Sequence, residues 1–179
     1  MQLEPYLLTD EALLWSGRPD PTKHFGRNDI LLVPFSVVWG GFAVFWEIEV
    51  LTSAAPGLLG LFGLPFVAMG LYMLFGRFIV KARRKRHTAY GLTDQRALVA
   101  LGTGALSESP LARQPIDRRV SRGRRHMSVV FGRQAHVLSS GAMYANTGME
   151  FFGRGSLPVG FYDVEDVTGL EGALRRVRR

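Results

Sequence analysis

The sequence predicts an α+β membrane protein, in which a two-helix transmembrane hairpin precedes an antiparallel β-barrel or sandwich capped by a C-terminal amphipathic helix. Three observations lead to this fold class. Almost no charge occurs between Asp29 and Arg77 of the 179-residue chain. Short apolar runs separated by turn residues follow. The last segment, from Asp163 onward, repeats apolar residues at helical spacing.

The first predicted helix, about residues 30–50, contains an uncharged run from Ile30 to Trp46. At 1.5 Å per residue this run covers about 25 Å of a hydrocarbon core roughly 30 Å thick. The second, about residues 58–80, follows a turn with Pro56 and Gly57 as breakers. Neither run carries the polar stripe of a helix in a soluble bundle, so we expect a membrane hairpin of residues 30–80.

Small residues on these helices are expected to let backbones approach closely, within the hairpin or between copies in a homo-oligomer. They are Gly40, Gly41, Gly60, Gly63 and Gly70. Glu47 and Glu49 are the only charges between Asp29 and Arg77, and Tyr72 is the only other ionisable group of the two apolar runs. A transporter or pump with a proton relay is therefore not expected.

The distribution of basic residues predicts the orientation. Residues 1–80 hold 4 basic and 7 acidic groups, whereas residues 81–179 hold 18 and 8. Basic residues flank both outer ends of the hairpin, and the connecting turn has none. By the positive-inside rule, the chain is expected in the cell (inner) membrane as a multi-pass protein with both termini cytoplasmic. Residues 1–29 are then a cytoplasmic N-terminal segment, and residues 81–179 a cytoplasmic domain.

The polar half is expected to be mainly β structure. Residues 88–92 and 97–101 predict a hairpin around the turn residues 93–96. Further strands are expected at residues 127–131, 136–138, 149–152 and 159–162. Asp163 is the expected cap of the C-terminal helix, with Asp166 in its first turn. Leu13, Leu14 and Trp15 are expected to offer this domain a further edge or packing surface.

Three segments resemble bacterial pleckstrin-homology-like (PH-like) domain proteins with a two-helix membrane anchor. They are YGLTDQRALV from Tyr90 to Val99, LWSGRP from Leu14 to Pro19 and GFYDV from Gly160 to Val164. The resemblance implies a membrane-anchored cytoplasmic PH-like module with a helix plugging one end of a barrel, and it supplies no enzymatic residues. Residues 113–126 depart from it, because they are much richer in arginine than the family's loop.

The sequence predicts no enzyme, metal site or cofactor. The four histidines show no metal-binding spacing, and the chain has no cysteine. The Ser139–Gly141 segment lacks the leading glycine of a nucleophile elbow, and Gly102–Gly104 lacks the lysine of a phosphate loop. We expect both to be turns.

Two basic clusters are the candidate sites for anionic lipid headgroups. The first directly follows the second helix, where it also serves as a topogenic signal. The second contains five arginines between residues 118 and 125. Their candidate members are Lys81, Arg83, Arg84, Lys85 and Arg86, and Arg118, Arg119, Arg122, Arg124 and Arg125. No aromatic residue lies between Leu111 and Met127, which disfavours single-stranded nucleic acid as the ligand.

The leading hypothesis is a non-enzymatic, membrane-anchored binding or scaffold module that binds an unidentified protein partner and contacts anionic membrane lipids. A partner peptide is expected to add a strand to an exposed sheet edge. Two alternatives remain. One is a membrane-tethered nucleic-acid-binding protein built on the arginine cluster, and the other is an accessory subunit of a membrane enzyme or transporter.

Overall fold

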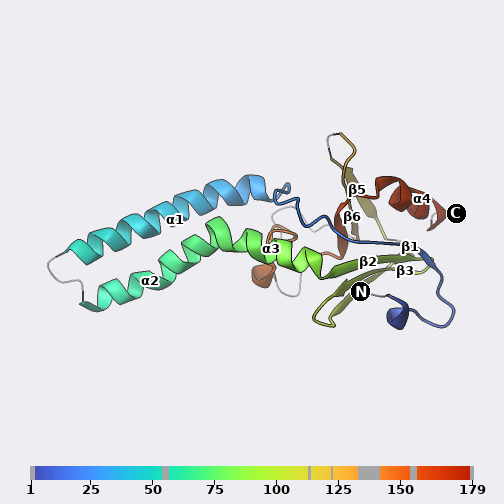
Figure 1. Ribbon diagram of the computed structural model, residues 1–179, viewed down its shortest axis with the longest axis horizontal. Coiled ribbons are helices and arrows are strands. Elements are labelled where there is room, and N and C mark those ends of the chain that lie inside the picture. Colours follow the sequence, from blue (N-terminus) through green and yellow to red (C-terminus); the bar gives the residue numbers. More distant parts are fainter. Residues whose placement is uncertain are drawn as a thin grey trace.

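The computed structural model describes residues 3–53, 57–112, 114–121, 123–132, 142–153 and 157–177. The molecule is elongated, with a pair of long helices at one end and a β-rich domain at the other (Figure 1). The short 3₁₀ helix η1 (Glu4–Tyr6) and the C-terminal helix α4 (Val167–Val177) both belong to the domain end. The predicted α+β class, with two apolar helices and antiparallel sheets, is confirmed.

The hairpin consists of α1 (Asp29–Thr52) and a second, longer helix. The second helix begins as α2 (Gly57–Leu71), passes through a π-helical turn η2 (Tyr72–Gly76) and ends as α3 (Arg77–Arg86). It bends at η2 (Figure 1), as expected where a π-bulge interrupts the α-helical hydrogen bonds. The basic residues 81–86 therefore continue the helix rather than starting the domain.

Glycines bring the two helices together. A Cβ atom added at Gly70 would lie 2.9 Å from the Cα atom of Gly40, so the two backbones touch. A Cβ atom added at Gly63 would collide with the Glu47 carboxylate, and one added at Gly60 would lie 3.0 Å from a methyl group of Leu51. Gly41 has nothing within 4 Å. Four of the five glycines thus serve packing within the hairpin.

Both helices are long and apolar enough to cross a membrane, judged by length and composition. In the most apolar 18-residue window, 28% of α1 and 22% of the second helix are buried. The exposed side chains are large and apolar, for example Val38 and Phe42 on α1 and Leu61 on α2. The hairpin therefore buries its small residues and turns its large ones outward.

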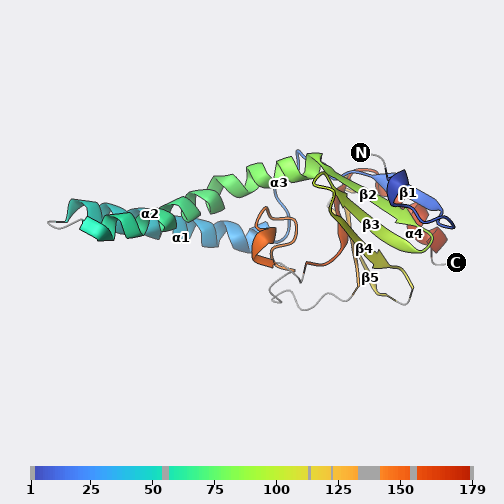
Figure 2. The same ribbon diagram turned by 90° about the horizontal axis from the view of Figure 1, so that it is seen from below.

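The first sheet has the strand order β1-β2-β3-β4, and all of its neighbours are antiparallel. Its strands are β1 (Leu13–Gly17), β2 (Thr88–Thr93), β3 (Arg96–Leu101) and β4 (Leu106–Pro110). Strand β1 precedes the helical hairpin in the chain, and Gly17 pairs with Tyr90 of β2. The hairpin is thus inserted between two adjacent strands, and the N-terminal segment is part of the domain (Figure 2).

The second sheet has the order β5-β6-β7, again antiparallel. Its strands are β5 (Ile116–Val120), β6 (Met127–Phe131) and β7 (Gly160–Val164). Among the described residues, no ladder joins the two sheets, and one isolated bridge links Pro19 to Val164. The expectation of a closed barrel is therefore wrong, because β4 and β5 do not pair.

The domain core lies between the sheets and α4. Phe161 of β7 is fully buried, and its ring centroid lies 4.9 Å from those of both Tyr90 and Phe131. Trp15 of β1 packs in the same cluster and donates from its Nε1 to Asp166 Oδ2 at 2.8 Å. Burial of each such side chain stabilises the fold by about 1.5 to 3 kcal/mol. The N-terminal strand and the C-terminal helix are thus joined through one tryptophan.

Several local predictions differ from the structure. Residues 149–152, expected as a strand, fall largely in a 3₁₀ helix η3 (Glu150–Gly153). The cap of α4 is Asp166, whose Oδ1 accepts from the Gly169 amide, whereas Asp163 lies in β7. Strands β4 and β5 were not expected. The predicted strand 136–138 and turn 139–141 lie outside the described residues.

Candidate functional site

The base of the hairpin is held by a buried ion-pair network between α1 and α3. Arg77 Nη1 lies 2.5 Å from Asp29 Oδ1, and Lys81 Nζ lies 3.0 Å from Asp29 Oδ2. All three side chains are at most 2% exposed. Lys81 also donates to the carbonyl oxygen of His24 at 2.6 Å. One carboxylate thus receives two cations and ties the start of α1 to α3.

One turn further along α3, Lys85 joins the helix to β7. Its Nζ lies 2.7 Å from Asp163 Oδ2 and also donates to the carbonyl oxygens of Asp20 and Lys23. The Lys23 ammonium and the Asn146 amide bind the same carboxylate. Burial disfavours the charged form of Asp163, but Lys85 and these hydrogen bonds outweigh that effect and lower the pKa of Asp163.

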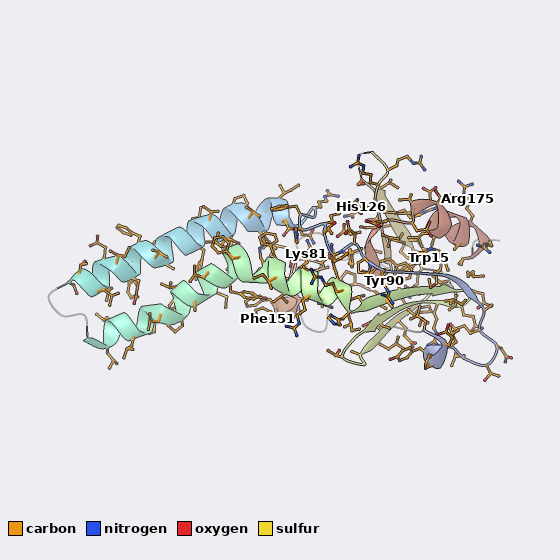
Figure 3. All side chains as sticks on the ribbon, viewed as in Figure 1. Trp15, Lys81, Tyr90, His126, Phe151 and Arg175 are labelled. Carbon is orange, nitrogen blue, oxygen red and sulfur yellow. The ribbon has the colours of Figure 1, made fainter. Side chains whose placement is uncertain are left out.

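The first basic cluster is therefore divided by the helix. Lys81 and Lys85 are four residues apart on the same face, turned inward, and they are not available to a lipid headgroup. Figure 3 shows Lys81 at this junction. Arg83 and Arg86 are exposed, and Arg84 is half-buried with its Nη1 3.2 Å from Glu150 Oε2. Three of the five candidates keep access to solvent.

The second cluster lies on β5 and on the turn to β6. Arg118 and Arg119 are on the strand, and Arg119 Nη2 lies 2.6 Å from Asp117 Oδ2. Arg124 and Arg125 are exposed in the turn, and Arg122 lies outside the described residues. Arg124 Nη2 lies 3.5 Å from Glu171 Oε2 while its side chain is 75% exposed. The expected arginine-rich loop is thus half strand and half turn.

A cleft of about 240 Å³ lies beside the second cluster, between the linker before α1 and the second sheet. Lys23 and Arg27 line it from the linker before α1, and Arg119 lines it from β5. The hydroxyl of Tyr162, on its wall, is buried and has no hydrogen-bond partner among the described residues, and burial raises the pKa of this tyrosine. Asp163 lines the same cleft and binds Lys23, and Asp117 binds Arg119, so carboxylates already pair with two of the three cations.

Sequence reasoning did not single out this cleft. Lys23 and Arg27 belong to the basic residues before the hairpin that predict its orientation, and Tyr162 belongs to the predicted strand 159–162. These residues lie far from Arg119 in the sequence, and no motif spans them. The positive charge of Lys23, Arg27 and Arg119 is the one feature of the sequence that could have pointed to the cleft.

His126 has a carboxylate partner that sequence spacing did not predict. Its Nε2 lies 2.8 Å from Asp20 Oδ2, and one ligand atom each from Asp20, His126 and Glu165 fall within 4.8 Å of one another. Asp20 Oδ1 also accepts from the amide and hydroxyl of Thr22. Burial raises the pKa of Asp20, but the hydrogen bonds with Thr22 and His126 outweigh this effect and lower the pKa to about 2. Hydrogen bonding already accounts for both Asp20 oxygens.

Comparisons with protein-family models, with curated proteins and with solved structures give no significant match to this chain.

Proposed function

We propose that the chain is a non-enzymatic, membrane-anchored binding module, of the PH-like kind that its sequence resembles. The hairpin crosses the bilayer, and the β domain stands at the cytoplasmic face. The observation that carries this proposal is the outward display of large apolar side chains along both helices. Ten such residues of α1 are exposed, and removing each from water is favourable by about 1 to 3 kcal/mol.

A soluble helical pair fits these observations poorly. Helices of that kind bury an apolar face against the rest of the protein and show a polar face to water. Here about three quarters of the apolar window of each helix is unburied. The β domain contacts only one end of the hairpin (Figure 1). A bilayer is the apolar partner that such a shape suits.

The basic residues support the cytoplasmic orientation. Arg27, Arg83 and Arg86 are exposed near the base of the hairpin, where the helices meet the domain. The tip near Ser53 lies far from them and carries no lysine or arginine. This asymmetry is typical of a hairpin whose two ends remain in the cytoplasm.

Anionic lipid is the first proposed ligand. Arg118, Arg124 and Arg125 lie on a β5–β6 hairpin that projects sideways from the axis of the helices (Figure 1). Each basic residue near an anionic leaflet contributes about 1 kcal/mol, screened within a Debye length of about 10 Å at moderate salt. Three such residues hold the domain in one orientation against the surface.

A protein segment is the second proposed ligand. Strand β4 pairs on one side with β3, and β5 pairs on one side with β6. Each offers a row of backbone donors and acceptors to a further strand, which is the way β-augmentation works. Ser107 and Glu108 are exposed on β4, and Arg118 on β5. An extended segment with acidic residues fits the β5 edge.

The lipid contact can be tested in the full-length chain reconstituted into bilayers. An environment-sensitive dye on Val120→Cys, a 41% exposed position at the end of β5, reports the surroundings of the turn. We expect a blue shift in bilayers containing anionic lipid, none in neutral bilayers, and reversal by salt. Replacing Arg118, Arg124 and Arg125 by glutamine should abolish the shift.

The matched control replaces Arg175 and Arg176, exposed arginines of α4, by glutamine and should keep the shift. Arg175 lies at the far end of the domain from the helices (Figure 3). An equal dye response in neutral and anionic bilayers would contradict the lipid contact. A stronger response to duplex DNA than to anionic lipid at the same salt would favour the tethered nucleic-acid binder.

A further inference from the structure

Residues 142–153, which precede β7, run beside the base of the helical hairpin. Tyr72, in the π-helical turn, donates from its hydroxyl to the carbonyl oxygen of Gly148 at 2.5 Å. Met149 is buried in a cluster with Leu32 of α1 and Met73 of η2. Figure 2 shows η3 next to the domain end of α1. This segment thus leaves the sheet and docks on the helices.

The segment is fitted closely to the helix. Gly148 has a φ of +83°, and a Cβ atom there would lie 2.0 Å from the carbonyl oxygen of Arg77. Glu150 accepts hydrogen bonds from the amides of Thr147 and Gly148, and it also pairs with Arg84. These contacts fix the position of η3 relative to α3.

Held in this way, η3 presents two exposed phenylalanines. Phe151 is 46% and Phe152 45% exposed, and their ring centroids are 4.0 Å apart. Phe151 also meets the Tyr72 ring edge-on, and Tyr144 lies against Phe152. Figure 3 shows Phe151 beside the helices at the base of the hairpin. The pair continues the apolar surface of the hairpin onto the domain.

The level of this pair along the hairpin follows from helix geometry. A hydrocarbon core of about 30 Å takes about 20 helical residues. Counted from Leu58 at the tip, 20 residues of rise reach about Phe78, and counted back from Leu51 they reach about Leu31. Leu32 and Tyr72, which hold the segment, both lie on the membrane side of these limits. Glu150, next to Phe151, pairs with Arg84 beyond the limit, so the phenylalanines lie at the boundary between the hydrocarbon core and the headgroups.

We propose that Phe151 and Phe152 insert into the bilayer interface next to the hairpin and form a third membrane contact, made by the β domain itself. The inference rests on the proposed function, because it needs the hairpin to be embedded. The ligand class is the glycerol and upper acyl region of a lipid leaflet, which suits aromatic side chains. The exposed Arg83 and Arg86 then lie at headgroup level, beyond the same limit.

Spin labels on single cysteines of the full-length chain in bilayers test this, since the chain has no native cysteine. Oxygen concentrates in lipid, whereas a charged nickel chelate stays in water, so the ratio of the two accessibilities reports immersion. The positions are Phe152→Cys, Phe42→Cys on the exposed face of α1, and Thr103→Cys in the β3–β4 turn. Position 42 lies near the middle of the span, whereas the pair lies at its edge. We therefore expect the label at 152 to favour oxygen over the nickel chelate much more than the label at 103 does, but less than the label at 42.

The outcomes separate the two proposals. If the label at 42 is immersed while that at 152 behaves like that at 103, the inference is wrong and the anchor stands. If the label at 42 is accessible to nickel, the membrane anchor itself fails. Low accessibility to both reagents at 152 would mean that protein, such as a second copy, covers the pair, and this also overturns the inference.

A second variant links the insertion to the docking of the segment. Gly148→Ala places a methyl group against the Arg77 carbonyl. The label at 152 should then become less accessible to oxygen and more accessible to the nickel chelate, while the label at 42 stays unchanged. Gly104→Ala is the matched control, because this glycine also has a positive φ but nothing within 4 Å. An unchanged reading at 152 in the Gly148 variant would contradict the proposed docking.

Discussion

The two basic clusters have similar composition, but the fold uses them in opposite ways. In the cluster of residues 81–86, Lys81 and Lys85 are buried and bound to Asp29 and Asp163. In the cluster of residues 118–125, the Arg119–Asp117 and Arg124–Glu171 ion pairs join exposed or partly exposed groups. A local run of charge therefore does not indicate whether its members are structural or free to bind.

The difference has a physical origin in backbone geometry. A helix turns residues four apart to the same side, so α3 sends two lysines inward and leaves Arg83 and Arg86 outside. Buried charges without partners are strongly unfavourable, and carboxylates from distant segments neutralise them here. The edge strand β5 and its turn offer no such interior. Pairs at their surface contribute about 0 to 1 kcal/mol.

The largest expected effect comes from Asp163→Asn. Asparagine tolerates the positive φ of 55° at this position, so the change removes the charge and keeps the backbone. Lys85 is then left buried beside Lys23 without a carboxylate, and the free energy of unfolding should fall by about 3 to 5 kcal/mol. Thermal unfolding of the chain in detergent measures this. A change below that of a surface variant would contradict the structural role of the network.

The second prediction compares two basic residues of one helix. Lys81→Met leaves Asp29 with Arg77 and the Gly26 amide and removes the bond to the His24 carbonyl, so we expect a loss of about 2 to 3 kcal/mol. Arg83→Met, two residues away and exposed, should change stability by less than about 0.5 kcal/mol. Equal effects of the two substitutions would erase the distinction between inward and outward residues.

The third prediction concerns an arginine of intermediate exposure, Arg96 on β3. It binds Glu11 through two hydrogen bonds of 2.8 and 2.9 Å, and this contact lowers the pKa of Glu11 from 4.5 to about 2. A carboxyl group whose pKa is lowered by folding stabilises the fold at any pH above its pKa in the unfolded chain. This contribution is lost as the pH falls from the unfolded pKa to the folded one. We expect a loss of about 2 kcal/mol between pH 4.5 and about 2.

Melting temperatures measured across this pH range check the prediction, with Glu11→Gln as the comparison. The Glu11→Gln variant should be less stable than the wild-type chain above pH 4.5, and it should lose less stability on acidification. A wild-type melting temperature that stays level to pH 2, or a variant with an equally steep loss, would rule out this contribution.

The smallest effect is expected for Arg124→Gln. Its pair with Glu171 is 3.5 Å long and lies at the surface, so the free energy of unfolding should change by less than about 0.5 kcal/mol. Arg124 has a positive φ of 53°. Glutamine bears the same backbone strain there as arginine, so the substitution does not change this strain. A loss above about 1 kcal/mol would show that this turn is structural, which would weaken its assignment to lipid.

The elements with a local signal were predicted from the sequence. Uncharged runs marked both long helices, and alternating apolar residues marked β2, β3, β6 and β7. Strands β4 and β5 were missed because LSESP and IDRRV are short, polar edge strands with little apolar alternation. The pairing of β1 with β2 joins segments separated by the whole hairpin, so the sequence predicted an edge or packing role for Leu13–Trp15 but not the partner strand.

The candidate site was less accessible to sequence reasoning, because its contacts are non-local. The carboxylates that bind Lys81 and Lys85 lie 52 and 78 residues away, and charge counting does not reveal such partners. The segment before β7 was misjudged for a related reason. Its conformation depends on the Tyr72 hydrogen bond and on a glycine against Arg77, neither of which has a signature within residues 149–152.

The central claim is that the hairpin crosses the bilayer and leaves the β domain in the cytoplasm. Cysteines placed singly at Ser53, at the exposed tip, and at Thr103, in the β3–β4 turn, test it with a membrane-impermeant thiol reagent on intact cells. We expect labelling at Ser53 without permeabilisation, and labelling at Thr103 only after it. Labelling at Thr103 but not at Ser53 in intact cells would contradict the orientation, and protection of both sites in intact cells would contradict the span.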